Sequence, residues 1–478
     1  MEPSIYRFRS AYALLDGYHE LENQEIYFAA LPELNDPLEG FKDLFWRGDS
    51  IVWRNLLRHY LLCLTQSVLS AKDAGPSHIL TSETLPVGAI DVDLHPEARG
   101  VFDALCGRFF ADAELASLPG LLAGRLLPVR RNELLSVLWP AHSRILKLLF
   151  STISPDMPIN VIDEILRSGP DRPLRFQESF AAQNKMDGSR SDSADITEQM
   201  TYRVTSVIAQ TIFLGEYRGA LAQHGEAWSA IRASFPEIYL NALERLLYFD
   251  WYVACFVADP NQASMWGTYG DSHRGVCLKF KTSPSASGKS SLTLRHVTGL
   301  TGTPASSSLT YDFRPLELQE VNYSERYDEI DFFRSLGRLA PPQIAFWFKG
   351  TDGAVSATGN ELLRGDPAWR QAYWGGFDTL TVTKLKDWQH EREYRLTLHS
   401  MIVNLEERSL RKLRYRFGDL QAIIFGIKTP TSEKMAIVRI IEEKCKREGR
   451  KNFEIYQTYY SRRTGRLATA PQDYVRFG

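Results

Sequence analysis

Trp388-Gln-His-Glu391-Arg-Glu393-Tyr-Arg395 is the segment of this chain that says most about its fold, and Leu-Thr-Leu-His follows it directly. Its aromatic and aliphatic residues favour a β-strand, which we expect at residues 390–398. Side chains alternate between the two faces of a strand, so Glu391, Glu393 and Arg395 should project together on one face. Three charges on one face indicate either a solvated edge strand or the wall of a functional site.

The length and composition of the chain limit its fold and its partners. With 478 residues it is too long for one compact core, and its 44% hydrophobic and 12% aromatic residues are ample for well-packed cores. The formal net charge of -2 provides no overall positive field that would attract nucleic acid or an anionic membrane. No apolar run reaches membrane-spanning length, and the N-terminus lacks a charged-then-apolar signal region. We therefore expect a cytoplasmic protein without a membrane partner.

The five cysteines are widely spaced, odd in number and form no Cys-x-x-Cys pair. This pattern is typical of reduced, mostly buried thiols in a reducing compartment. His59 and Cys63 lie one helical turn apart, but such a pair supplies only two of the four ligands of a structural zinc site. We expect no metal site.

The spacing of apolar residues divides the chain into three parts. Residues 1–48 contain two short strand patterns, residues 49–249 repeat apolar side chains at helical spacing, and residues 250–478 return to strand patterns. These patterns predict an α+β domain interrupted by a large all-α insertion. Within the third part, residues 282–309 are rich in Ser, Thr, Gly, Pro and Ala, so we expect a flexible loop there.

The segment Leu-Asn35-Asp36-Pro37-Leu-Glu39 follows the second expected strand. Its residues are typical of a helix start, with Asp36 as the N-cap, Pro37 at the first helical position and Glu39 reaching back to the cap. A rigid helix start could also present Asn35 or Asp36 to a ligand. The structural and functional interpretations are compatible.

Two further segments combine aromatic and polar residues. Ser264-Met-Trp266-Gly-Thr-Tyr269 predicts a short helix with both aromatic side chains on one face, an arrangement found more often in a core than at a ligand. The density of Trp, Tyr, His and Arg in and after it leaves a binding role open. In the first expected strand, Arg7 and Arg9 alternate with aromatic residues, and arginine facing a cleft beside carboxylates would clamp an anion or a phosphate.

Six short segments, taken in order, resemble the signature of a widespread bacterial family catalogued as a domain of unknown function. They are residues 6–9, 34–39, 265–280, 321–323, 388–395 and 423–426. The resemblance covers roughly the first 45 residues and most of the chain after residue 249, whereas the helical block has no counterpart. Some members of this family are encoded near bacterial anti-phage defence genes, which implies a role as a toxic effector.

The order of these parts is similar, at a greater distance, to arginine-type ADP-ribosyltransferases, which combine a first-strand arginine, a serine-containing middle motif and a late Glu-x-Glu. This resemblance implies a split β-sheet core, mixed or antiparallel, and NAD as the substrate. Glu393 would hold the ribose and stabilise the oxocarbenium-like cation, and Glu391 would orient or deprotonate the acceptor, an unidentified protein or nucleic acid, or water. The chain departs from the pattern because it has no Ser-Thr-Ser motif, only Ser264 before Met265.

The same resemblance implies a set of residues that bind NAD. Arg7 would act at the nicotinamide ribose or a phosphate, Trp266 or Tyr269 would pack on the nicotinamide ring, and Arg395 would keep a glutamate ionised. The complete expected set is Arg7, Arg9, Asn35, Asp36, Ser264, Trp266, Tyr269 and Arg395.

Two other classes of function also fit the sequence. A metal-dependent nuclease could gather Asp36, Glu39, Glu391 and Glu393 around a divalent ion, with a lysine such as Lys386 nearby. A binding or sensor module could use the charged strand as a buried network and the helical insertion to recognise a regulatory protein. The near-neutral charge does not support a nucleic-acid partner for the nuclease. The resemblance to ADP-ribosyltransferases makes the NAD-consuming enzyme the favoured prediction.

Overall fold

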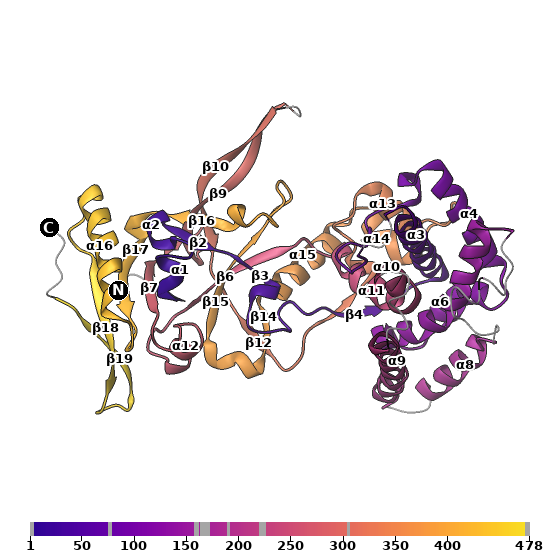
Figure 1. Cartoon of the computed structure of the whole chain (residues 1–478), viewed down its shortest axis with the longest axis horizontal. Coiled ribbons are helices and arrows are strands. Elements are labelled where there is room, and N and C mark those ends of the chain that lie inside the picture. The colour runs from indigo at the N-terminus through magenta and orange to yellow at the C-terminus, as the bar shows by residue number, and fades with distance from the viewer. Residues whose placement is uncertain are drawn as a thin grey trace. The chain divides into compact units, whose positions relative to one another are not determined.

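The computed structural model describes residues 4–74, 79–156, 162, 173–188, 192–218, 226–303 and 306–473. The chain forms two compact units (Figure 1). Unit 1 consists of residues 1–41, 249–327 and 377–478, and unit 2 of residues 42–248 and 328–376. The chain therefore passes from one unit to the other four times.

Unit 1 contains a sheet whose strand order is β11-β15-β6-β1-β7-β17-β18-β19, with β3 also paired to β6. Its neighbours are antiparallel except for β17 and β18, which are parallel and joined by the crossover helix α16 (Thr431–Glu448). The strands are β1 (Ser4–Arg9), β3 (Ala29–Ala30), β6 (Trp251–Val257), β7 (Val276–Lys281), β11 (Gln319–Glu320), β15 (Glu393–His399), β17 (Leu420–Phe425), β18 (Glu454–Ser461) and β19 (Arg466–Pro471).

A second sheet of unit 1 has the strand order β10-β9-β16-β2, with β8 paired to β9. Its strands are β2 (Glu25–Tyr27), β8 (Ser283–Pro284), β9 (Ser290–Thr303), β10 (Ser306–Glu317) and β16 (Lys412–Tyr415). Buried Leu294 and Leu413 of this sheet belong to the same core as Phe280 and Ile423 of the larger sheet and Ile441 of α16. The two sheets therefore share one core, and the fold is α+β.

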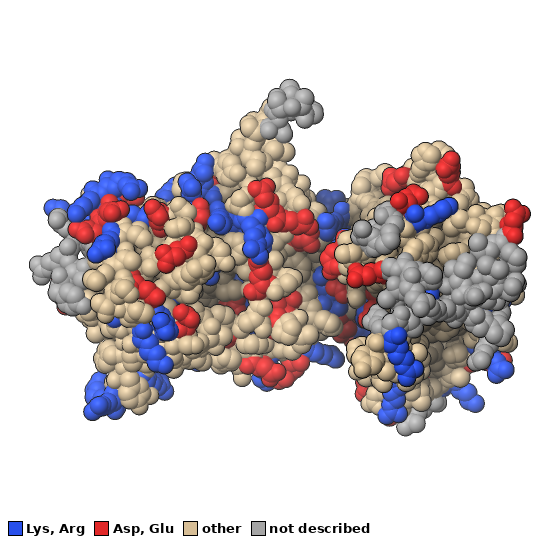
Figure 2. Space-filling view, in the orientation of Figure 1, with Lys and Arg blue, Asp and Glu red and all other residues tan. Residues whose placement is uncertain are grey.

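The remaining elements of unit 1 are short. β12 (Asn322–Ser324) and β14 (Thr383–Leu385) form a parallel pair, and the helices are α1 (Ala11–Leu14), α2 (Glu20–Asn23) and α12 (Ala263–Thr268). On the face shown in Figure 2, Lys and Arg side chains gather over α16, and elsewhere on unit 1 both signs of charge are interspersed.

Strands β9 and β10 form a long hairpin that extends from the rest of unit 1 (Figure 1). The prediction of a flexible loop at residues 282–309 was wrong, because β8, β9 and the start of β10 occupy most of that range. Residues 304 and 305 lie outside the described residues. Leu292 and Leu294 alternate with Thr293 and Arg295 in β9, and the two leucines enter the core. The β-branched threonines that make the segment polar also favour paired strands.

Unit 2 is mainly helical. Its helices are α3 (Ser50–Ala74), α4 (Pro96–Ala111), α5 (Leu118–Ala123), α6 (Arg131–Ile153), α8 (Phe176–Asp187), α9 (Ser193–Tyr217), α10 (Glu226–Ser229), α11 (Phe235–Leu243), α13 (Pro341–Phe348) and α14 (Asn360–Leu363). Helix α15 (Pro367–Val382) begins in unit 2 and ends among residues of unit 1. Among the described residues, no helix is long and apolar enough to cross a membrane.

The boundaries of unit 2 differ from those expected for an all-α insertion at residues 49–249. Unit 2 also includes residues 42–48 and 328–376, and it contains a sheet of order β13-β4-β5, made of β4 (Asp43–Trp46), β5 (Val129–Arg130) and β13 (Glu329–Asp331). Pairing of β13 with β4 brings the later segment into this unit, and Asn55 of α3 donates hydrogen bonds to two backbone carbonyl oxygens at residues 347 and 349.

Candidate active site

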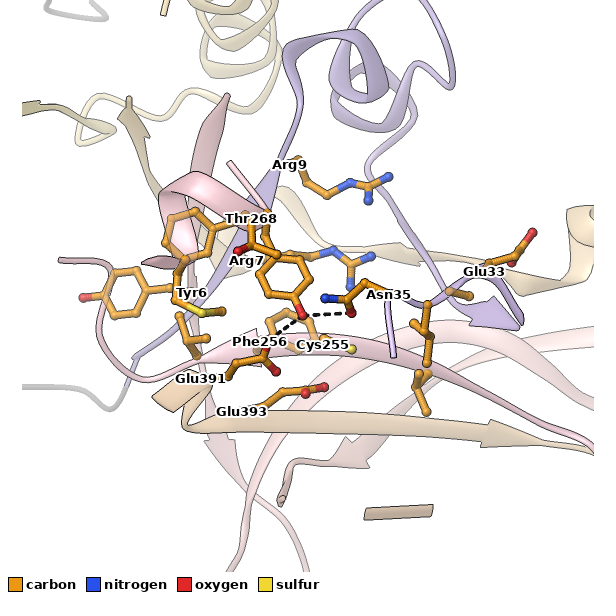
Figure 3. A pocket seen from close by; sticks show the side chains of 17 residues that line it. Tyr6, Arg7, Arg9, Glu33, Asn35, Cys255, Phe256, Thr268, Glu391 and Glu393 are labelled. Carbon is orange, nitrogen blue, oxygen red and sulfur yellow. Dashed lines mark hydrogen bonds between the residues drawn. The ribbon is translucent and has the colours of Figure 1, made fainter. Parts of the chain in front are cut away.

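A cavity of about 310 Å³ lies in unit 1 where the edge of β6 changes its pairing partner. Strand β1 pairs with β6 at Tyr6 and Val257, whereas β3 pairs with β6 at Ala29 and Val253. The stretch of β6 between these two pairings leaves room for the cavity. The lining residues come from β1, residues 29–35, β6, α12 with the turn after it, and the segment that enters β15 (Figure 3).

Two glutamates from residues 388–395, Glu391 and Glu393, line this cavity. Glu393 is the first residue of β15, but Glu391 is the last residue of a 3-10 helix (Lys386–Glu391), and Arg392 between them has a left-handed backbone with φ of 48°. The strand expected from residue 390 therefore begins three residues later. Glu391 nevertheless reaches the same cavity, because the turn at Arg392 redirects it (Figure 3).

Both glutamates belong to a buried cluster of charged side chains. Lys384 Nζ donates to Oε2 of Glu391 at 2.6 Å and to Oε2 of Glu393 at 3.3 Å. Arg395 Nε donates to Oε1 of Glu393 at 2.7 Å, and its two terminal nitrogens donate to the oxygens of Glu39 at 2.6 and 2.9 Å. Three carboxylates thus share two cations, and good pairing geometry offsets much of the cost of removing the charges from water.

The cluster keeps Glu393 ionised. Burial acts to raise the pKa of Glu393, but Arg395 and Lys384 outweigh it and lower the pKa to about 2. The Cys255 thiol lies close to this carboxylate and lines the cavity, and burial together with the charge of Glu393 raises its pKa well above the usual value. At neutral pH the cavity therefore has an anionic wall at Glu393 and a neutral thiol beside it.

Tyr269 connects Glu391 to Asn35 on the opposite side of the cavity. Its hydroxyl oxygen lies 2.6 Å from Oε1 of Glu391, to which it donates, and 3.0 Å from Oδ1 of Asn35. The dashed lines in Figure 3 that end at Glu391 and Asn35 mark these two contacts. Burial and the charge of Glu391 raise the pKa of Tyr269 far above its usual value, so the hydroxyl keeps its proton. This contact fixes the position of Glu391.

Arg7 is a buried cation on the cavity wall contributed by β1. Its Nη2 donates to the carbonyl oxygen of Tyr27 at 2.8 Å, whereas Nε and Nη1 are buried and have no hydrogen-bond partner among the described residues. Burial lowers the pKa of Arg7 to about 10, which leaves the guanidinium charged at neutral pH. Buried donors are rarely left unpaired, so these two nitrogens indicate a site for an anionic ligand.

Four of the eight residues expected to bind NAD line this cavity: Arg7, Arg9, Asn35 and Tyr269. Arg9 differs from Arg7 because its guanidinium already forms an ion pair with Glu20, with Nε 2.7 Å from Oε2. Of these two arginines, Arg7 is the one with buried donors that lack a partner among the described residues.

The other four expected residues do not line the cavity. Trp266 is fully buried, and its Nε1 donates to the carbonyl oxygen of Pro260 at 2.7 Å. Ser264 is exposed on α12, and Arg395 acts behind the glutamates rather than on the cavity surface. Asp36 is buried in a turn, where its Oδ1 accepts from the backbone N–H of Leu38 at 2.9 Å.

The prediction of a helix that starts at Asp36 was wrong, because residues 37–40 form a turn. The Glu39 side chain, expected to return to the cap, pairs with Arg395 instead. Lys386 was the lysine predicted to lie near the carboxylates, but it pairs with Glu325 at the surface. Lys384, two residues earlier, is the buried partner, and the strand pattern of this short segment did not distinguish the two lysines.

Residues behind the cavity hold Glu393 and α12 in place. The backbone N–H of Glu393 donates to the Tyr323 hydroxyl at 2.9 Å, and the backbone N–H of Val321 donates to the carbonyl oxygen of Glu393 at 2.9 Å. At Gly426 an added Cβ would lie 2.4 Å from the carbonyl oxygen of His273 and 2.9 Å from the Trp266 ring. The six segments singled out in the sequence therefore surround or support one site.

A family model described as a protein of unknown function (DUF2971) matches residues 265–396. The match begins in α12 and ends in β15, so it includes Tyr269, Lys384, Glu391 and Glu393 but not Arg7. This description agrees with the resemblance to a domain of unknown function and assigns no chemistry. Neither a curated protein nor a solved structure matches the chain.

Proposed function

We propose that unit 1 cleaves NAD in the manner of an ADP-ribosyltransferase and transfers ADP-ribose to a macromolecular acceptor or to water. One observation carries the proposal: ionised Glu393 and the incompletely paired guanidinium of Arg7 line the same cavity. NAD has charges that complement both, because its nicotinamide ring is cationic and its pyrophosphate is anionic.

The reaction breaks the bond between C1′ of the ribose and the ring nitrogen of nicotinamide. The bonding electron pair leaves with nicotinamide, which becomes neutral, and positive charge develops at C1′ and the ribose ring oxygen. In this proposal the carboxylate of Glu393 stabilises that charge. The oxygen or nitrogen of the acceptor then bonds to C1′, and its proton passes to Glu391, which Tyr269 holds in position.

The size of the cavity is consistent with one end of a dinucleotide. A volume of about 310 Å³ lies at the lower end of the range for small-molecule sites. We place the nicotinamide and its ribose inside the cavity, with a phosphate at Arg7 and the adenosine outside. Loss of cellular NAD would make the protein a toxic effector in a bacterial cell, as anti-phage defence requires.

The metal-dependent nuclease has less support from the geometry. The oxygens of Glu39, Glu391 and Glu393 accept hydrogen bonds from Lys384 and Arg395, which occupy the positions that a divalent cation would need. Within the described ranges, no group of three or more His, Cys, Asp or Glu side chains could hold a metal ion. A binding module remains the second candidate, because the buried cluster pairs most of its charges internally.

Release of nicotinamide from NAD tests the proposal. The purified full chain should release nicotinamide, and the Glu393→Gln variant should do so about a hundredfold more slowly, since removing a group that stabilises transition-state charge has an effect of this size. Thermal melting of both proteins checks that the variant is folded, and EDTA should leave the rate unchanged. If the wild type releases no more nicotinamide than NAD alone, with or without protein, RNA or DNA as acceptor, the enzyme proposal is wrong.

A further inference from the structure

Unit 2 contains a cavity of its own, with a volume of about 530 Å³. It lies beside β4 and β13 and is lined by three arginines, Arg47, Arg125 and Arg334, together with Trp46, Asp331 and Thr358. Nothing in the proposed chemistry of unit 1 uses these residues.

Arg125 lines this cavity with a side chain that is only 1% exposed. Its Nη1 forms an ion pair with Oδ2 of Asp187 at 2.7 Å, and its Nε pairs with Glu133. The remaining nitrogen, Nη2, is buried and has no hydrogen-bond partner in the described part of the chain. Its two anionic partners fix the guanidinium and leave one donor for a ligand.

Trp46 also lines this cavity and has a buried donor without a partner in the described ranges. Its Nε1 also lacks a hydrogen-bond partner among residues that the structure describes, although the side chain is almost completely buried. An indole N–H can only donate, so its partner must be an acceptor. Two residues that line one cavity therefore each have a buried donor without an acceptor among the described residues, which favours a ligand with acceptor oxygens.

The other polar groups of the cavity suit an anionic acceptor. Arg47 is exposed, and its positive charge acts on Asp331. The hydroxyl of Thr358 accepts from the backbone N–H of Asp49 at 3.3 Å, which leaves its own proton for a ligand. Arg334 and Glu361 neutralise each other as an ion pair. The ionised carboxylate of Asp331 would repel an anion. Burial raises the pKa of Asp331 to about 6, so this repulsion weakens as the pH falls towards 6.

We propose that the cavity of unit 2 binds the phosphate group of a small phosphorylated molecule. Arg125 Nη2, Trp46 Nε1 and Arg47 donate to the phosphate oxygens. Leu122, Leu127 and Val129 line the same cavity and receive the less polar part of the ligand. This site is separate from the NAD site proposed for unit 1, and it gives the helical unit a ligand of its own.

Calorimetric titration of the full chain with inorganic phosphate tests this site. The Arg7→Met variant should retain the phosphate binding that belongs to unit 2, which separates this site from any binding in unit 1. Arg47→Ala should weaken the binding about tenfold, because a charge-assisted hydrogen bond contributes roughly that factor. Arg203→Ala, which removes an exposed arginine outside the cavity, should leave it unchanged.

Trp46→Phe provides a second variant, since it keeps an aromatic ring and removes only the N–H donor. It should weaken phosphate binding at least threefold, and circular dichroism should show that it is folded. The proposal is overturned if phosphate does not bind the Arg7→Met protein, if Arg47→Ala and Trp46→Phe both bind it as the parent does, or if acetate binds as tightly as phosphate.

Discussion

Arg7 and Arg395 are both buried in unit 1, but their surroundings differ. Arg395 donates to Glu393, to Glu39 and to the carbonyl oxygen of Thr381, whereas Arg7 makes one hydrogen bond and leaves two donors without partners among the described residues. A buried cation with so few partners costs folding free energy. We attribute its presence at this position to ligand binding.

Replacing each arginine by methionine should therefore change the free energy of unfolding by very different amounts. Arg7→Met should lower the free energy of unfolding by less than about 1 kcal/mol, or raise it, because it removes an incompletely paired buried charge. Arg395→Met should lower it by about 3–5 kcal/mol, because it leaves carboxylates unpaired. Urea denaturation measures both. Equal destabilisation by the two changes would show that Arg7 is an ordinary structural residue.

The low pKa of Glu393 predicts how the stability of unit 1 depends on pH. Its pKa is about 2 in the folded protein and about 4.3 in an unfolded chain, so the ionised side chain stabilises the fold above pH 4.3 and loses this effect as the pH falls towards 2. The free energy of unfolding should fall less steeply with acid in Glu393→Gln than in the wild type. Equal slopes between about pH 5 and 2 would contradict the pairing of Glu393 with Arg395 and Lys384.

At the scale of elements, close backbone contacts join the start of the sheet to α12. At Gly275 an added Cβ would lie 2.5 Å from the carbonyl oxygen of Arg9 and 2.9 Å from that of Gly270, both of which are backbone atoms. The residue before β7 therefore packs closely against the end of β1, at Arg9, and against the turn after α12, at Gly270. These elements carry Arg7 and Tyr269.

Gly275→Ala should therefore lower the free energy of unfolding by about 1–3 kcal/mol and reduce NAD cleavage, because the backbone must shift. Gly267→Ala is the matched control, since nothing lies within 4 Å of its added Cβ and alanine favours the helix by up to about 1 kcal/mol. Thermal melting and nicotinamide release measure both variants. If the control is as damaging as Gly275→Ala, the close-contact argument fails.

Local sequence patterns predicted some of these elements and missed others for identifiable reasons. Alternation along a strand placed Glu393 and Arg395 on one face, and the two side chains are hydrogen-bonded. The same reasoning put Glu391 on that strand, which was wrong because alternation cannot reveal the left-handed turn at Arg392. The cap predicted for Glu39 failed because a partner 356 residues away competes with it, and no local pattern encodes that contact.

The candidate active site of the molecule is assembled from segments that lie far apart in the chain. Arg7 lies in β1 and Glu393 in β15, far apart in the sequence, and the order of motifs was the indication that they meet. The division into units was harder to predict, because residues 328–376 join unit 2 through the pairing of β13 with β4. A strand of three residues carries too little periodicity to reveal its partner.

A crystal structure of the Glu393→Gln variant with NAD would show directly whether unit 1 holds the dinucleotide as proposed. We expect the nicotinamide ribose in the cavity of unit 1 with C1′ next to residue 393, and a phosphate in contact with Nε or Nη1 of Arg7. NAD bound elsewhere, or an empty cavity at an NAD concentration that saturates wild-type turnover, would contradict the proposal.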